Sequence, residues 1–158
     1  MRALLAILSM SLLPFVAQAV TVSCTTSVSS LAFGIYNPLS PSADTSTGSL
    51  SVTCTGQGPG SKSVSVGVAL SAGLSGSFAT RRMFSGANTL DYNIYWSTAY
   101  TQVMGDGSGG SFPGTAGPFT VFGGSSTTVT GTMYGRIPAL QDVAPGSYAD
   151  TIVVTVTY

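Results

Sequence analysis

Histidine and glutamate are absent from this 158-residue sequence, and only 6% of its residues are charged. Without histidine, neither a Ser-His-Asp triad nor a Cys-His pair can form, and the commonest zinc ligand is missing. Five lysines and arginines balance five aspartates, so the chain has no basic excess for binding nucleic acid. These absences disfavour most hydrolytic enzymes and indicate a structural or binding protein.

The aspartates are the only side-chain carboxylates, at Asp44, Asp91, Asp106, Asp142 and Asp150. Asp106 lies in a glycine-rich stretch, and a calcium-binding loop is one interpretation of it. A single carboxylate, however, cannot supply the usual set of oxygen ligands. We therefore expect a turn at Asp106. We expect no metal, no cofactor and no catalytic residue in this chain.

Residues 1–19 have the features of a secretory signal peptide. Arg2 gives a positive start, an apolar stretch follows, and Ala17-Gln18-Ala19 matches the small-x-small cleavage pattern. A membrane anchor is the alternative, but Pro14 interrupts the apolar run, which is short for a bilayer core of about 30 Å. We predict cleavage after Ala19, an exported chain without membrane insertion, and a single domain over residues 20–158.

The remaining sequence is rich in serine, threonine and glycine, and its apolar residues recur at every second position. A disordered low-complexity chain is the alternative, but this period favours strands around a packed core. Glycine and proline clusters separate the segments. An all-β, immunoglobulin-like sandwich is the predicted fold. The predicted strands are residues 20–25, 29–36, 49–55, 63–70, 89–96, 119–122, 127–137 and 148–158.

The alternation also predicts which side chains face the core. The last strand alternates in the same way, and Arg81 and Arg82 are expected in a solvated loop. The predicted inward residues are Val64, Val66, Val68 and Leu70; Leu90, Tyr92, Ile94 and Trp96; Val129, Met133 and Ile137; and, in the last strand, Ile152, Val154, Val156 and Tyr158.

Cys24 and Cys54 are the only cysteines, and we predict that they form a disulfide. Each alternates with apolar residues on the inward face of a predicted strand, so both sulfurs point into the same core. A reactive thiol is the alternative, but no histidine or lysine is near in sequence to activate it.

The order of several short motifs resembles the spore coat protein U domain family, which includes the pilins of the archaic, Csu-type chaperone-usher pathway. The resemblance spans residues 20–158. Its motifs are Cys24 followed by residues 31–38 (LAFGIYNP), residues 48–54 (GSLSVTC), Arg82-Met83 before residues 90–95 (LDYNIY), residues 105–107 (GDG), residues 133–138 (MYGRIP) and residues 145–151 (PGSYADT).

This resemblance implies an incomplete sandwich that lacks its final strand and is filled by a strand from a partner. The implied partners are a periplasmic chaperone, an outer-membrane usher and neighbouring pilin-like subunits. The implied role is a structural subunit, exported through the periplasm to the cell surface or beyond, of a pilus or coat that supports adhesion or biofilm formation. The expected strand-acceptor edge is Ile152, Val154, Val156 and Tyr158.

Two alternatives remain open from the residues alone. The last strand can instead pair within a complete sandwich, in which case the chain is a self-contained secreted adhesive or glycan-binding domain. The N-terminus also departs from the pilin pattern, because cleavage after Ala19 leaves only residues 20–23 before Cys24. A segment this short is expected to be unable to fill the groove of a neighbour.

Overall fold

The computed structural model describes residues 19–158, and within them it contains eight β-strands and no helix. The predicted leader, apart from Ala19, lies outside the described residues. The prediction of an all-β fold is confirmed. The strands are β1 Thr21–Val28, β2 Asp44–Gln57, β3 Ser61–Leu70, β4 Arg81–Ser85, β5 Asn88–Tyr95, β6 Gly114–Phe122, β7 Ser126–Ile137 and β8 Val154–Thr157.

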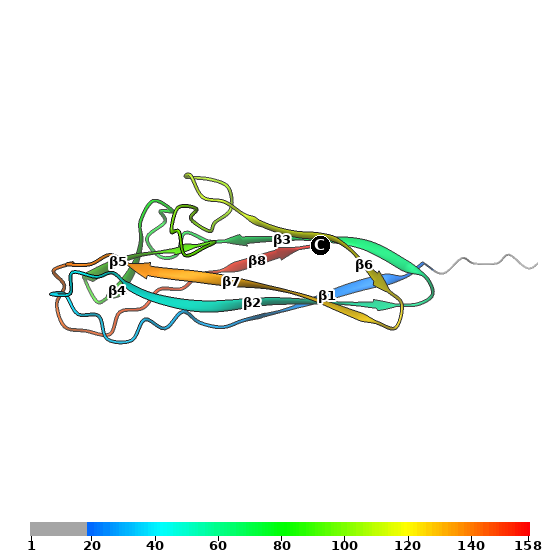
Figure 1. Cartoon of the computed structure of the whole chain (residues 1–158), viewed down its shortest axis with the longest axis horizontal. Helices are drawn as coiled ribbons and strands as arrows, with labels where there is room; N and C mark the ends of the chain where they lie inside the picture. Colours follow the sequence, from blue (N-terminus) through cyan, green and yellow to red (C-terminus); the bar gives the residue numbers. More distant parts are fainter. Residues whose placement is uncertain (1–18) are drawn as a thin grey trace, which may run out of the picture.

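These strands form a sandwich of two antiparallel sheets, seen edge-on as two elongated layers in Figure 1. One sheet has five strands in the order β1-β2-β7-β5-β4, and the other has three in the order β6-β3-β8. In the described part of the chain, β1 pairs only with β2, and β8 pairs only with β3. Each sheet therefore has one free edge formed by a strand near an end of the chain.

The predicted inward faces form the core between the layers. Val64, Val66, Val68 and Leu70 are all buried on β3, and their neighbours on the strand point outward. The predicted inward residues of β5 and β7 also pack in the core, although Val129, and Trp96 just after β5, are only half-buried. Asn93, on the opposite face of β5, is buried too, because its side chain bonds Arg81 and the carbonyl of Phe78.

The predicted disulfide is present, between adjacent strands. Cys24 on β1 lies directly opposite Cys54 on β2, and their Cα atoms are 4.0 Å apart. In an antiparallel ladder, opposed residues that do not exchange backbone hydrogen bonds with each other have the shortest Cα–Cα distances. Such a short distance suits a disulfide between neighbouring strands. The bond therefore fastens the edge strand β1 to the sheet at the fully buried Cys54.

The prediction of a strand at residues 29–36 is wrong, because this extended segment has no ladder with a neighbour. Ser29 donates a backbone hydrogen bond to the carbonyl of Ser49, and beyond it the carbonyl of Ala32 accepts from the Ser46 hydroxyl. The last strand is also shorter than predicted, because only Val154–Thr157 pairs with β3.

The prediction that Arg81 lies in a solvated loop is wrong as well. Arg81 opens β4, a strand that the sequence analysis missed, and its side chain is fully buried. The guanidinium donates hydrogen bonds to the carbonyls of Ser71 and Met104 and to Oδ1 of Asn93, at 2.7 to 3.1 Å. Burial lowers the pKa of Arg81, but a guanidinium keeps its charge in proteins, so these acceptors are what stabilises it.

Arg82, the next residue, does face solvent. Its Nε lies 3.0 Å from Oδ1 of Asp91 on the neighbouring strand β5, and both side chains are substantially exposed. The two arginines thus point to opposite faces of β4, as neighbours in a strand must.

Candidate strand-acceptor groove

An apolar groove runs between the two free edges of the sandwich. One wall is formed by residues 28–33, which continue from β1, and the other by residues 148–154, which lead into β8. Its floor consists of side chains from the core, including Met83, Tyr92, Ile94 and Met133. The groove therefore lies along the side of the sandwich where the described residues place no strand over the core.

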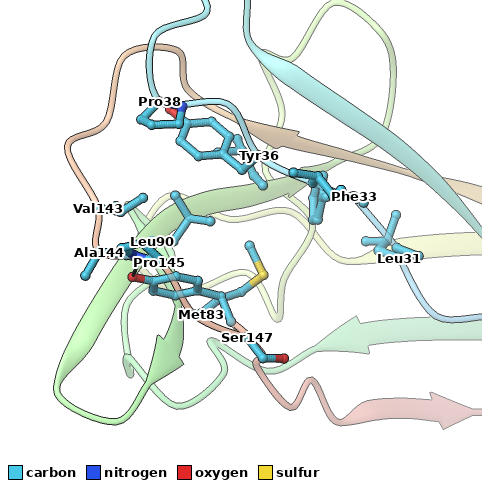
Figure 2. A pocket seen from close by; sticks show the side chains of 16 residues that line it. Leu31, Phe33, Tyr36, Pro38, Met83, Leu90, Val143, Ala144, Pro145 and Ser147 are labelled. Atoms are coloured by element: carbon cyan, nitrogen blue, oxygen red, sulfur yellow. Dashed lines mark hydrogen bonds between the residues drawn. The ribbon is translucent and has the colours of Figure 1, made fainter.

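The groove has two connected parts that share Leu31, Phe33, Met83 and Tyr148. The narrow part, bordered by Val28 and Val154, has a volume of about 410 Å³. The wide part, next to β4 and β5, has a volume of about 690 Å³. Figure 2 shows the wide part, with Leu31 and Phe33 on one wall and Pro145 and Ser147 on the other.

Phe33 positions the first wall. Its ring meets Tyr92 edge-on, with the ring centroids 6.1 Å apart. It also packs over Gly135 of β7, where an added Cβ atom would lie only 2.6 Å from the Phe33 ring. A side chain at this position would clash with the ring, so the glycine is what allows the wall to lie against the sheet.

Tyr36 fastens the segment after the first wall to the loop that follows β7, at the wide end of the groove. Its hydroxyl donates to the carbonyl of Pro138 at 2.9 Å and accepts from the backbone N–H of Gln141 at 2.8 Å. The Gln141 side chain in turn bonds the backbone of Asp91 on β5. These contacts tie residue 36 through the loop after β7 to β5 of the five-stranded sheet.

The second wall presents unpaired main-chain groups to the groove. The carbonyl of Val153 accepts a hydrogen bond from the N–H of Ser71 at 2.9 Å, so Val153 directs its main chain toward β3. Because this direction alternates along a strand, the N–H and C=O groups of Val154 and Val156 point away from β3, to the free edge. The side chains of these same two residues are half-buried and face the core.

Among the described residues that line the groove, Asp150 is the only Asp, Glu, Lys or Arg. Its Oδ2 accepts from the Tyr92 hydroxyl at 2.7 Å, and its Oδ1 accepts from the backbone N–H groups of Leu74 and Thr151. Burial raises the pKa of Tyr92 well above its ordinary value, and the hydrogen bond to Asp150 raises it further. The phenol is therefore neutral, and the rest of the lining is uncharged.

The four residues predicted to form the acceptor edge are placed differently. Ile152 and Val154 line the narrow part of the groove. Val156 packs against the core farther along β8, and Tyr158 is 60% exposed and lies outside the lining. Sequence reasoning missed the opposite wall, with Leu31, Phe33 and Tyr36, although its alternating apolar pattern was visible.

The described residues hold no group of three or more cysteine and aspartate side chains that could bind a metal ion. Asp106 instead accepts two hydrogen bonds from Ser108, which close the glycine-rich turn. In residues 19–158, no helix is long and apolar enough to cross a membrane.

Comparison with known proteins agrees with this architecture. The model of the Spore Coat Protein U domain matches residues 11–155. The chain belongs to this family. Protein U of Myxococcus xanthus is 32% identical over 135 residues. The match covers 81% of this chain and 71% of Protein U.

A solved structure has a similar fold. It is the crystal structure of the CsuC–CsuE chaperone–tip adhesion subunit pre-assembly complex from the archaic chaperone-usher Csu pili of Acinetobacter baumannii. One of its chains matches with a TM-score of 0.56 and 18% identity over 87% of this chain. The match spans only 40% of the chain in the complex, and at this identity it shows a shared fold alone.

Proposed function

We propose that this chain is an exported structural subunit of a pilus or coat, without enzymatic activity, whose groove accepts a β-strand from a partner. The groove itself is the observation that supports this most directly. Core side chains such as Met133 and Ile94 form its floor, and the free edge of β8 forms one side. An added strand would cover the floor and pair with that edge.

The physical basis of this proposal is strand addition to an open sheet. Main-chain hydrogen bonds from Val154 and Val156 would supply affinity, and the hollows along the floor would select alternate side chains. An uncovered apolar groove beside a free edge also promotes aggregation, so such a subunit needs a protecting partner before assembly.

The family and the similar fold support a proposal about the partners. The matched crystal structure is a complex of a chaperone with a subunit of archaic chaperone-usher pili. We therefore propose a periplasmic chaperone as the first occupant of the groove, an outer-membrane usher as the assembly platform, and neighbouring subunits as later occupants. In this proposal the assembled protein lies at the cell surface, where it supports adhesion or biofilm formation.

Production with and without a chaperone tests the open groove. The wild-type chain is produced in the periplasm alone, and beside a chaperone encoded in the same gene cluster. We expect soluble protein only with the chaperone, as a one-to-one complex by size exclusion. Equal amounts of soluble monomer in both cases would show that the sandwich is closed.

A matched pair of substitutions on β8 adds a control. Val154→Asp places a carboxylate in the apolar groove, at a cost of several kcal/mol by the roughly 2–7 kcal/mol scale for burying unpaired polar groups. Thr155→Asp places the same charge on the exposed face of the strand. We expect the first variant to lose the chaperone complex and the second to keep it.

A further inference from the structure

Aromatic side chains gather on the outer face of the five-stranded sheet, which points away from the core and from the groove. Tyr134 on β7 lies between the buried residues Met133 and Gly135, so its own side chain points outward. Tyr95 on β5 lies directly opposite Tyr134, and Thr47 on β2 lies opposite it on the other side. Strand pairing therefore places two tyrosine rings next to each other on this face.

A third ring and a cation complete this tyrosine cluster. Tyr100, from the loop after β5, meets Tyr95 edge-on, with the ring centroids 5.4 Å apart. The guanidinium carbon of Arg136 lies 5.2 Å from the centroid of the Tyr100 ring. Arg136 follows Tyr134 by two residues on β7, so the two side chains leave the same face of the strand about 7 Å apart. The contact with Tyr100 holds the guanidinium beside the rings.

Arg136 has no anionic partner in the part of the chain that the structure describes. The ion pair found there joins Arg82 to Asp91, and the side chain of Arg136 is exposed. Asp44 is near in the sheet, but it precedes Thr45, the residue opposite Arg136, and so points to the other face of β2. The guanidinium is therefore available to a ligand, and its planar fork of donors matches a carboxylate.

Beyond the tyrosine cluster, the same face carries a strip of hydroxyl side chains along β2 and β7. These face each other in pairs: Ser49 with Thr132, Ser51 with Thr130, Thr53 with Thr128, and Thr55 with Ser126. Those on β7 are exposed, and none of the eight is charged. A strip of neutral hydrogen-bond donors and acceptors thus leads away from the rings and the cation.

We propose that this outer face binds a polysaccharide that carries carboxylate groups, such as a polymer of uronic acids. A sugar ring has a face of C–H groups that packs on aromatic rings, and its hydroxyls bond to side chains such as Thr47 and the hydroxyl strip. The carboxylate of a sugar that covers Tyr134 would reach Arg136. The proposal rests on the adhesive role proposed above and names its ligand, but it uses no part of the groove.

Nucleic acid is a poorer match to this face, although its bases also stack on tyrosine rings. Its binding depends on several cations that neutralise phosphates along the strand. Within residues 19–158, Arg136 is the unpaired cation at the tyrosine cluster, and the hydroxyl strip adds none. A saccharide needs only one such contact in addition to ring packing and hydroxyl bonds.

Calorimetric titration with matched saccharides tests the ligand class. The exported chain, beside its chaperone, is titrated with tetragalacturonate, with the fully methyl-esterified tetrasaccharide and with a short oligothymidylate. We expect the acid to bind, and the ester to bind at least about tenfold more weakly because the charged hydrogen bond to Arg136 is lost. Equal affinity for acid and ester, binding of neither, or tighter binding of the oligothymidylate would overturn the inference.

Two matched pairs of substitutions test the residues. Arg136→Gln and Tyr134→Thr should each weaken binding of tetragalacturonate about tenfold or more. Arg82→Gln and Tyr158→Thr change an exposed arginine and an exposed tyrosine outside the cluster, and should leave the affinity unchanged. Thermal melting of all four variants checks the fold. Unchanged affinity in Arg136→Gln, at an exposed position, would overturn the inference even if Tyr134→Thr did not fold. These failures would leave the strand-acceptor function intact, because chaperone dependence tests that function separately.

Discussion

The hydroxyl of Tyr92 donates a hydrogen bond of 2.7 Å to Oδ2 of Asp150, and this contact joins the two layers of the sandwich. Tyr92 lies on β5 of the five-stranded sheet, and Asp150 precedes β8 of the three-stranded sheet. Ala149, the residue before Asp150, still exchanges backbone hydrogen bonds with Phe84 of β4. Asp150 therefore marks the point at which the final segment leaves one sheet for the other.

The free energy of unfolding should decrease as the pH rises through the alkaline range, because of Tyr92. Its pKa in the folded chain is raised above the ordinary value of 10.0, so the unfolded chain loses this proton first as the pH rises. The stability contributed by the neutral phenol is complete below pH 10 and declines above it, by up to about 1.4 kcal/mol per pH unit. Tyr92→Phe should flatten this decline in urea melts between pH 9 and 11, and Tyr158→Phe, at an exposed position, should not. Equal slopes for wild type and Tyr92→Phe would contradict the assignment.

Removal of the disulfide should destabilise the domain markedly. Replacing Cys24 or Cys54 with serine releases a constraint over a sequence separation of 30, and we expect a loss of about 2–5 kcal/mol. Urea denaturation of the exported protein measures this loss, with the double Cys→Ser variant as a comparison. Intact-mass analysis after alkylation, with and without reductant, checks that the wild-type protein has no free thiol. Two free thiols in the exported material would rule out the bond.

The two adjacent arginines should behave very differently on substitution. Arg81→Met leaves the carbonyls of Ser71 and Met104 and the Asn93 side chain without their donor, so we expect a loss of about 2–5 kcal/mol. Arg82→Met breaks only an exposed ion pair and should cost about 0–1 kcal/mol. Both losses are measured by chemical denaturation of peptide-complemented protein. Similar losses for the two variants would mean that Arg81 is not held in the buried network.

Two glycines of β7 give a matched test of the groove wall. At Gly135 an added Cβ meets the Phe33 ring, whereas at Gly131 it meets nothing within 4 Å. Gly135→Ala should displace Phe33, cost about 1–3 kcal/mol and weaken binding of a donor peptide. Gly131→Ala should leave binding unchanged. Calorimetric titration of both variants with one peptide compares them, and unchanged affinity in Gly135→Ala would show that Phe33 does not shape the groove.

Local alternation was sufficient to predict β3, β5 and the facing cysteines, because it records which side of a strand is buried. It failed at residues 29–36, where Leu31 and Phe33 alternate because they pack over a sheet without pairing to it. Pairing depends on a distant partner, which local pattern does not contain. The same reason explains Arg81, whose acceptors come from three other segments of the chain.

The groove was predictable only in part for a related reason. Ile152 and Val154 were expected at an acceptor edge from the family resemblance, and their alternation predicted only that they face inward. The other side of the groove lies more than a hundred residues earlier in the sequence. Only the fold brings Phe33 close to the segment that carries Tyr148.

The crossing of the final segment between the sheets also determines when the groove can exist. A chain is synthesised from its N-terminus, so β1 to β7 are complete before residues 148–157 become available. The five-stranded sheet can form without them, but one wall of the groove cannot. A partner that recognises the finished groove can therefore act only on a chain that already includes residues 148–157, and a chain stopped before Asp150 would present a half-covered core with no acceptor edge.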